Sequence, residues 1–286
     1  MNFPVVSTSA NATPENAEFR PMYINDVKPV IALIHATDDD DAEAASADFD
    51  ELGLDNQYVI ELDDKVIAVT GFRAIEASDR SCWLNWTYVH PSFQGKGFGR
   101  MLLTRLLDTL RESDASKIFV KVSDYENEAG VSVYERAMGL YSSQAFALEL
   151  TNEDFYDEDE SQLIYGLKLK ADIADEELEI VEEKPIIRFC GLFEIAETEG
   201  AYTFRWEVKG TKKLFGKRNF SDEDLSLGLQ AARDDGARKV FLTFPSNLPL
   251  IHKPLQAAGF KYIGLLTDYY EQGVHEYHFS HDLQGL

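Results

Sequence analysis

Apolar residues recur at three- and four-residue steps after Gly99, and charged residues occupy the positions between them. The apolar positions are Met101, Leu102, Leu103, Leu106, Leu107 and Leu110. This period is typical of an amphipathic helix that packs one stripe against a sheet. The helix is expected to begin at Gly97-Phe98-Gly99, where glycine allows another group to approach the backbone closely.

Apolar runs bounded by turn residues predict strands along the first 170 residues. The predicted strands are 18–22, 57–61, 66–75, 81–89, 117–122, 146–150 and 163–170. Two more helices are predicted. One is capped by Asn25 or Asp26 and ends at His35, and the other covers 127–138 and is closed by Gly139. The alternation of strands and helices indicates an α/β fold.

Residues 89–100 read Val-His-Pro-Ser-Phe-Gln-Gly-Lys-Gly-Phe-Gly-Arg and lead from a strand into the leucine-striped helix. The first turn of a helix has unpaired N–H groups and the positive end of the helix dipole, so it can hold an anion. Lys96, Arg100 and Arg105 add positive charge, and no acid lies between Pro91 and Leu107. The pattern predicts a phosphate-binding loop. The spacing fits neither a P-loop nor a dinucleotide fingerprint, and the alternative is a tight turn before a helix without any ligand.

The segment Gln94-Gly95-Lys96-Gly97-Phe98-Gly99 resembles the acetyl-CoA motif Q/R-x-x-G-x-G/A of the GNAT N-acetyltransferase superfamily. The preceding Val89-His90-Pro91 resembles the Val-x-Pro of that family. The likeness in the order of elements covers about residues 17–170. It implies a mixed, mostly antiparallel, twisted central sheet flanked by helices.

The resemblance also implies a chemistry, in which an acetyl group passes from acetyl-CoA directly to a primary amine without a metal. It assigns cofactor binding to Tyr88, Val89, Gln94, Gly95, Lys96, Gly97, Phe98, Gly99, Arg100 and Asn127. In relatives, free backbone N–H groups at the positions of Tyr88 and Val89 lie near the thioester carbonyl, and Asn127 would face the pantetheine arm. The segment 133–139 looks like the family's tyrosine-bearing helix, so Tyr134 is expected to protonate the leaving thiolate. The alternative is a tyrosine of the core or its rim.

No general base is assigned from the sequence. Many relatives place a glutamate on the strand before Val-x-Pro, but residues 82–88 contain no carboxylate, and Asn85 cannot act as a base. Glu76, Asp79 or His90 could serve directly or through a water molecule.

The chain has 286 residues and a net charge of −24, which argues against binding to nucleic acid or an anionic membrane. Acids gather at 38–51, 153–160 and 172–183. The first group is expected between the first and second helices, either as a solvated loop or as a surface that attracts a cationic amine. Residues 1–16 are expected to be a flexible tail.

Two cysteines without metal-type spacing, no secretory leader and no apolar run of about 20 residues favour the cytoplasm. His275, His278 and His281 invite a metal hypothesis, but a structural or solvent-facing role is favoured, because spacings of three alternate between the faces of a strand.

The second part of the chain repeats features of the first. Residues 107–120 align with 229–242 when one residue is dropped, and 137–140 is echoed by 257–260. This pattern predicts an internal duplication, although chance similarity is the alternative. The expected organisation is a catalytic GNAT domain at 17–170, an acidic linker at 171–185 and a smaller GNAT-like domain at 186–286. The second copy has Gly216-Lys-Arg-Asn-Phe-Ser221 in place of the CoA motif, so it is expected to have lost the cofactor.

We therefore expect acetyl-CoA-dependent N-acetylation of a primary amine on a small metabolite or a peptide, with an oligomer left open. One alternative is a noncatalytic acyl-CoA-binding regulatory module, which the missing strand carboxylate favours. Another is an interaction protein that uses its acidic surface.

Overall fold

The computed structural model describes residues 16–127, 129–174, 185–211, 222–248 and 251–283. Their contacts form two compact units. Unit 1 comprises residues up to Ala74 and Cys82–Ala115, and unit 2 comprises Ile75–Ser81 and the residues from Ser116 onward. The division between the units therefore falls inside the predicted catalytic domain. This division describes packing alone, so the domain boundaries at 17–170, 171–185 and 186–286 remain predictions. Of the tail predicted at 1–16, residues 1–15 lie outside the described residues.

Unit 1 contains four antiparallel strands in the order β1-β2-β3-β4. The elements of this part of the chain are β1 (Glu18–Pro21), η1 (Ile24–Asp26), α1 (Val27–His35), α2 (Asp39–Leu52), β2 (Gln57–Leu62), β3 (Lys65–Ala74), β4 (Ser81–Val89), η2 (Pro91–Phe93) and α3 (Phe98–Glu112). The strands predicted from the apolar pattern are confirmed here within a few residues. Helix α1 begins at Val27, directly after Asp26.

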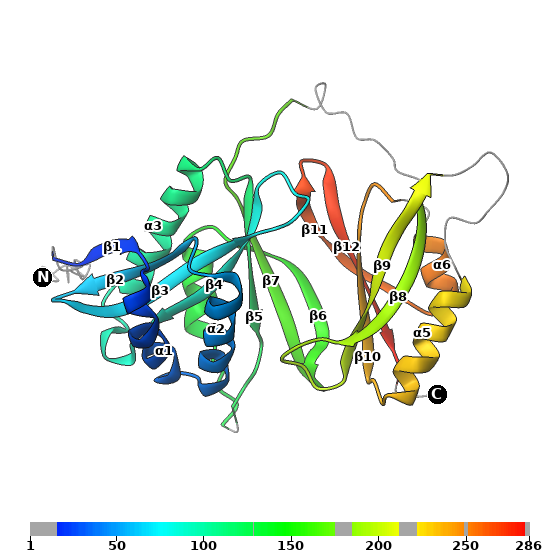
Figure 1. Cartoon of the computed structure of the whole chain (residues 1–286), viewed down its shortest axis with the longest axis horizontal. Coiled ribbons are helices and arrows are strands. Elements are labelled where there is room, and N and C mark those ends of the chain that lie inside the picture. The colour runs from blue at the N-terminus through cyan, green and yellow to red at the C-terminus, as the bar shows by residue number, and fades with distance from the viewer. Residues whose placement is uncertain (1–15, 128, 175–184, 212–221, 249–250, 284–286) are drawn as a thin grey trace, which may run out of the picture. The chain divides into compact units, whose positions relative to one another are not determined.

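Helices α1 and α2 lie on one face of this sheet and α3 lies on the other (Figure 1). Leu33 and Phe49 pack with Val59 and Val69 on the first face. On the second face, Phe98 and Leu102 pack with strand residues such as Ile60. The buried residues of α3 are Phe98, Leu102, Leu103, Leu106, Leu107 and Leu110, so the predicted leucine stripe is confirmed.

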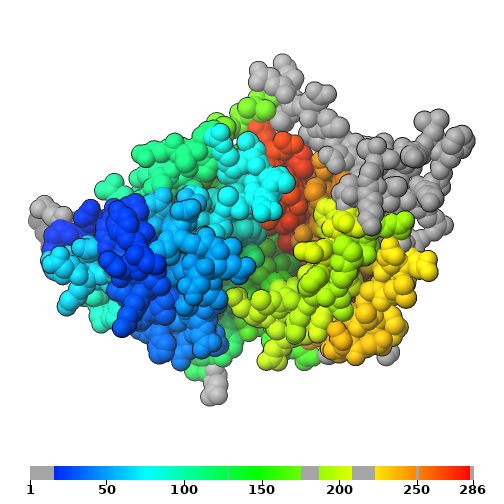
Figure 2. All heavy atoms as spheres, in the orientation of Figure 1, coloured from blue at the N-terminus to red at the C-terminus, as the bar shows by residue number. Residues whose placement is uncertain are grey.

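The acids at 38–51 do not form a loop, and that expectation is wrong. They build α2 itself. Asp38 is its N-cap, where the carboxylate accepts the Asp41 N–H at 3.0 Å, and the next acids lie in the first turn. Carboxylates are favourable at this end because they satisfy unpaired N–H groups and complement the helix dipole. The outer side of the first two helices is open to solvent, as the blue spheres of Figure 2 show.

Unit 2 contains a three-stranded antiparallel part in the order β5-β7-β6 and a five-stranded sheet in the order β11-β12-β10-β9-β8. Its elements are β5 (Lys117–Ser123), α4 (Glu135–Ser143), β6 (Ala147–Asp157), β7 (Glu160–Lys168), β8 (Pro185–Glu194), β9 (Ala201–Thr211), α5 (Asp222–Asp234), β10 (Lys239–Pro245), α6 (His252–Ala257), β11 (Lys261–Glu271) and β12 (Val274–Asp282). Strands β9 and β10 are parallel, so the second sheet is mixed. Leu225 and Leu229 of α5 and Leu255 of α6 share one apolar core with this sheet.

The helix predicted at 127–138 is wrong at both ends. Helix α4 begins only at Glu135, and Gly139 lies inside it rather than closing it. The Asn127 Oδ1 atom accepts the N–H groups of Ala129 and Val131 at 3.0 and 3.2 Å. Such a local side-chain turn offers the backbone an alternative to helical hydrogen bonds, which explains the late start.

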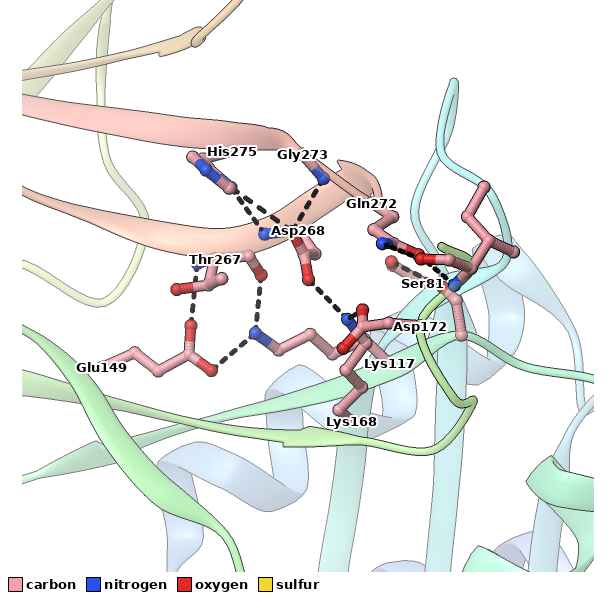
Figure 3. Close-up of polar contacts among 12 residues, drawn as sticks. Ser81, Lys117, Glu149, Lys168, Asp172, Thr267, Asp268, Gln272, Gly273 and His275 are labelled. Atoms are coloured by element: carbon pink, nitrogen blue, oxygen red, sulfur yellow. Dashed lines mark hydrogen bonds and ion pairs between the residues drawn. The ribbon is translucent and has the colours of Figure 1, made fainter. Parts of the chain in front are cut away.

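Strands β5, β6 and β7 with α4 recur in the same order as β10, β11 and β12 with α6, and a buried lysine begins each set. Lys117 Nζ donates to the Thr267 carbonyl at 2.5 Å and lies 2.6 Å from Glu149 Oε1 (Figure 3). Lys239 Nζ donates to the Glu153 carbonyl at 2.8 Å. The lysine of each set thus donates to the backbone of the other set.

The partners of these lysines correspond as well. Asp154 and Asp268 follow the two accepting carbonyls and have positive φ angles of 50° and 49°. Asp154 Oδ1 accepts the Asp159 N–H, and Asp268 Oδ1 accepts the Gly273 N–H. Lys168 lies 2.7 Å from Asp268, as Figure 3 shows.

Aromatic contacts repeat the same exchange between the two sets. The Phe119 ring of β5 lies 5.3 Å from the Tyr269 ring of β11, and the Phe241 ring of β10 lies 5.0 Å from the Phe155 ring of β6. Reciprocal contacts of this kind are typical of a pair related by two-fold symmetry. They are what an internal duplication would produce.

Candidate functional site

The carboxyl end of β4 leads into the predicted phosphate-binding loop. The His90 N–H donates to the Ile67 carbonyl of β3 at 2.9 Å, so these residues form a hydrogen-bonded pair. Hydrogen-bonded and non-hydrogen-bonded pairs alternate along antiparallel strands, so the N–H and carbonyl of Val89 are directed away from β3. The Val89 carbonyl accepts Gln94 Nε2 at 3.0 Å. By the same alternation the Tyr88 N–H lies on the β3 side, which favours Val89 over Tyr88 as a donor to a ligand.

Two aromatic residues anchor the loop from beneath. Phe98 is fully buried in the core between α3 and the sheet, and the Phe93 ring meets it edge to face at 6.0 Å. The His90 side chain caps the short turn at 91–93 by accepting the Ser92 N–H at 3.2 Å. His90 thus has a structural role in this loop, whatever else it does.

Glycines allow the backbone to turn into α3. Gly95 and Gly97 have φ angles of 72° and 90°, a region that other residues rarely adopt. Gly97 is the N-cap, and its carbonyl accepts the first helical bond, from the Met101 N–H at 3.0 Å. The N–H groups of the first turn, at 98–100, would need the carbonyls at 94–96, which precede the helix, so they have no acceptor within it.

Cationic side chains lie beside these N–H groups. Lys96 is exposed, donates to the Ser92 carbonyl at 2.8 Å and lies over the Phe93 ring at 5.2 Å. Arg100 is exposed on the first turn of α3. An exposed helix N-terminus with two cations and glycines on its approach is suited to a diphosphate.

A β-bulge that the sequence pattern did not predict interrupts β4 next to this loop. Val69 pairs with Tyr88 and Gly71 with Asn85, so Trp86 and Thr87 together oppose Thr70. Trp86 has a φ of 40°, which is a strained conformation for a bulky residue. Trp86 and Tyr88 both face α1 and α2, and the alternation of strand residues is interrupted next to them. This interruption is the only sign of the bulge in the sequence, and it is too weak to predict it.

Two acids of α2 contact aromatic residues in this bulge and directly after it. Trp86 Nε1 donates to Asp48 Oδ2 at 2.9 Å, and the Tyr88 hydroxyl donates to Asp41 Oδ2. Asp41 and Asp48 are seven residues apart, which puts them on one face of a helix. These acids were expected in a loop, so their contacts with β4 were not predicted.

The remaining predicted site residues belong to unit 2. Tyr134 is half-buried and is the N-cap of α4, where its carbonyl accepts the Met138 N–H at 3.0 Å. Asn127 uses its carboxamide oxygen within its own turn. Of the possible bases, Glu76 and Asp79 are exposed in the loop after β3, where the Asp79 N–H donates to the Tyr270 carbonyl. The roles of Tyr134 and Asn127 remain predictions.

The three histidines of β12 are held by neighbouring groups. His278 lies 2.9 Å from Glu276, His281 contacts the Asp282 carbonyl, and His275 Nδ1 accepts the Asp268 N–H. Within the described ranges, no three histidine, cysteine or acidic side chains are grouped to hold a metal ion. Among the helices so described, none is long and apolar enough to cross a membrane.

Comparison with known proteins gives a family match. The model of the acetyltransferase (GNAT) family matches residues 27–140, which include the loop, α3 and both acids. No curated protein matches the chain.

Solved structures are also similar. A GNAT-family protein from Desulfovibrio desulfuricans has a TM-score of 0.49 and 21% identity, and the match covers 54% of this chain and 99% of that one. The ribosomal-protein-S18-alanine N-acetyltransferase of Escherichia coli has a TM-score of 0.45 and 19% identity over 57% and 99% of the two chains. A Salmonella typhimurium protein solved with its cofactor acetyl-CoA has a TM-score of 0.43 and 21% identity over 57% and 100%.

Proposed function

We propose that this protein transfers an acetyl group from acetyl-CoA directly to a primary amine, because the model of the acetyltransferase (GNAT) family matches residues 27–140. The acceptor is a small metabolite or a peptide. The observation that carries the proposal is the loop at 94–100, where glycines with positive φ expose the first N–H groups of α3 beside Lys96 and Arg100. A diphosphate is the part of CoA that these groups suit.

The reaction divides into tasks for this chain's residues. The amine nitrogen attacks the thioester carbonyl, the C–S bond breaks, the amine loses a proton and the thiolate gains one. The outward-directed N–H of Val89 would stabilise the oxyanion that forms in between. Tyr134 would supply the proton to the sulfur. Holding both reactants in register accounts for much of the rate in transfers of this kind.

A noncatalytic acyl-CoA-binding module is the second candidate, because residues 82–88 lack the carboxylate that many relatives use as a base. Release of free thiol from acetyl-CoA in the presence of an amine panel separates the two. Thiol release above the uncatalysed rate supports the enzyme, and tight CoA binding without any turnover supports the module.

The loop itself is tested by substituting its N-cap glycine. We expect Gly97→Ala to weaken CoA binding about tenfold in titration calorimetry, because a strained N-cap would displace the N–H groups. Gly53→Ala is the matched control. Gly53 ends α2 with a φ of 75° and open space around it, so it carries similar strain away from the loop. Equal CoA affinities for the two variants, or no heat with the unaltered protein, would overturn the proposal.

We also propose that residues 186–286 are a degenerate second copy without a CoA site. The reciprocal lysine and aromatic contacts of unit 2 support the duplication, while residues 216–221 lie outside the described ranges. A cytoplasmic protein with a cationic acceptor and no nucleic-acid or membrane partner completes the proposal. The net charge of −24 and the presence of only two cysteines in the sequence support it.

A further inference from the structure

Three residues form a row across the sheet of unit 1. Gln57 of β2 pairs in register with Gly71 of β3, and Gly71 pairs with Asn85 of β4. Side chains of residues directly opposite each other lie on the same face of a sheet. Val59 and Val69, two residues from Gln57 and Gly71, pack against α1 and α2, so the row lies on that helical face.

The amides of this row are buried without partners. Gln57 is 1% exposed, and neither its Oε1 nor its Nε2 atom has a hydrogen-bond partner. The Nδ2 atom of Asn85 is also buried and unpaired. A Cβ atom at Gly71 would overlap the Gln57 carboxamide, so that carboxamide lies over the glycine, in the space between the two neighbouring strands.

Such an arrangement is unfavourable unless something else satisfies it. An unsatisfied buried polar group costs about 1–3 kcal/mol, and native structures contain few of them. A contrast exists in unit 2, where the buried Gln162 carboxamide oxygen accepts a hydrogen bond from Asn152 Nδ2 at 2.9 Å. Gln57 offers both a donor and an acceptor, and Asn85 offers a donor. A ligand with an amide or a hydroxyl group would satisfy both residues.

The same face carries negative charge nearer to the CoA loop. Asp41 and Asp48 of α2 contact Tyr88 and Trp86 on β4, between Asn85 and Val89. Tyr88 pairs with Val69, two residues from Gly71 along β3. Two residues of a strand span about 7 Å. The row of Tyr88, whose hydroxyl contacts Asp41, and the row of the amide pair are therefore about that far apart on one face.

We infer that this face binds the acceptor, with Asp41 and Asp48 attracting the ammonium group and Gln57 and Asn85 bonding a neutral polar group about 7 Å from it. The acceptor is then a primary amine that carries an amide or a hydroxyl group about six to seven bonds from its nitrogen. This inference rests on the proposed acetyl transfer and specifies its substrate class.

The test compares acceptors that differ only at the distal group, namely 6-aminohexanamide, 6-amino-1-hexanol and hexylamine, in the thiol-release assay with the full chain. The first two should have a KM about tenfold below that of hexylamine, which corresponds to about one hydrogen bond to a buried group. Gln57→Leu should raise the KM for the amide to that of hexylamine and leave CoA affinity unchanged. It should also raise Tm, because an orphaned amide is replaced by an apolar group.

Gln162→Leu is the matched control, since it removes a buried amide that already has a partner. It should lower Tm and leave every KM unchanged. If the three acceptors share one KM, or if Gln57→Leu does not alter their ratio, the acceptor inference is wrong while acetyl transfer stands. If CoA binds and no amine is acetylated, acetyl transfer fails. In that case, calorimetry would still test the acceptor site. Binding of 6-aminohexanamide to the unaltered protein but not to Gln57→Leu would support the site, and no binding to the unaltered protein would reject it.

Discussion

At the scale of single residues, the structure separates roles that the sequence left mixed. His90 is a turn cap, Val89 directs its N–H away from β3, and Asp41 reaches the Tyr88 hydroxyl. The glycine motif could be predicted because it needs only local order. The contact of Asp41 could not, since it depends on the packing of a helix against a strand 47 residues further along the chain.

Tyr134 is the residue whose chemistry is most directly testable. We expect Tyr134→Phe to lower kcat about 100-fold, because the leaving thiolate would lose its proton donor, and to change CoA affinity less than twofold. Tyr125→Phe is the control, since Tyr125 is an exposed tyrosine of the same segment. Similar kcat values for the two variants would assign Tyr134 to the structure rather than to the reaction.

The two cysteines should differ sharply in reactivity. Burial raises the pKa of the Cys82 thiol to about 12, whereas Cys190 is exposed. At pH 8 the thiolate fraction of Cys82 is then about 10⁻⁴, and thiolate is the reactive form. A disulfide reagent should label Cys190 in the folded protein and Cys82 only in guanidinium chloride. Cys190→Ser should abolish the reaction of the native protein, and rapid labelling of that variant would contradict the prediction.

At the scale of elements, the apolar period predicted α3 and the strands well, because each has one face in a core. Helix α4 was mispredicted, since the Asn127 side chain bonds backbone N–H groups that a helix would need. The acids of α2 were mistaken for a loop because charge runs are usually solvated. The buried face of α2 consists of only three residues, Ala42, Ala45 and Phe49, and two of them are small, so the apolar helical period is weak.

The capping of α2 leads to a prediction with opposite signs at the two helix ends. Asp38→Ala removes the acceptor of the Asp41 N–H and should lower the free energy of unfolding by about 1 kcal/mol. Asp50→Ala removes an exposed acid from the last turn, where the helix dipole disfavours negative charge, and should leave stability unchanged or slightly raised. Denaturant titrations measure both, and equal losses would argue against the cap.

At the scale of the whole molecule, Asp154 and Asp268 couple stability to pH. Burial alone would raise their pKa values, but Lys239 beside the first and Lys168 beside the second outweigh it, so both are lowered from 3.8. A carboxyl that is more acidic in the folded chain stabilises it fully above the unfolded pKa, and this contribution is lost as pH falls through the folded value. Unit 2 should therefore lose stability below about pH 4.

The variant Asp154→Asn/Asp268→Asn tests this coupling. It should be about 1 kcal/mol less stable than the unaltered protein at pH 7, and the difference should shrink below pH 4, where the native carboxyls become protonated. Asn tolerates the positive φ at both positions. Asp50→Asn is the exposed control. A difference in the free energy of unfolding that stays constant from pH 7 to pH 3 would contradict the assignment.

The reciprocal lysine contacts of unit 2 have a kinetic consequence. Two separate chains held by such contacts would part on dilution, because their association depends on concentration. Here both partners belong to one polypeptide, so meeting is intramolecular and its effective concentration is fixed by the tether. Pairing of the two strand sets therefore does not depend on the concentration of the protein, and each set pairs with the other set of the same chain.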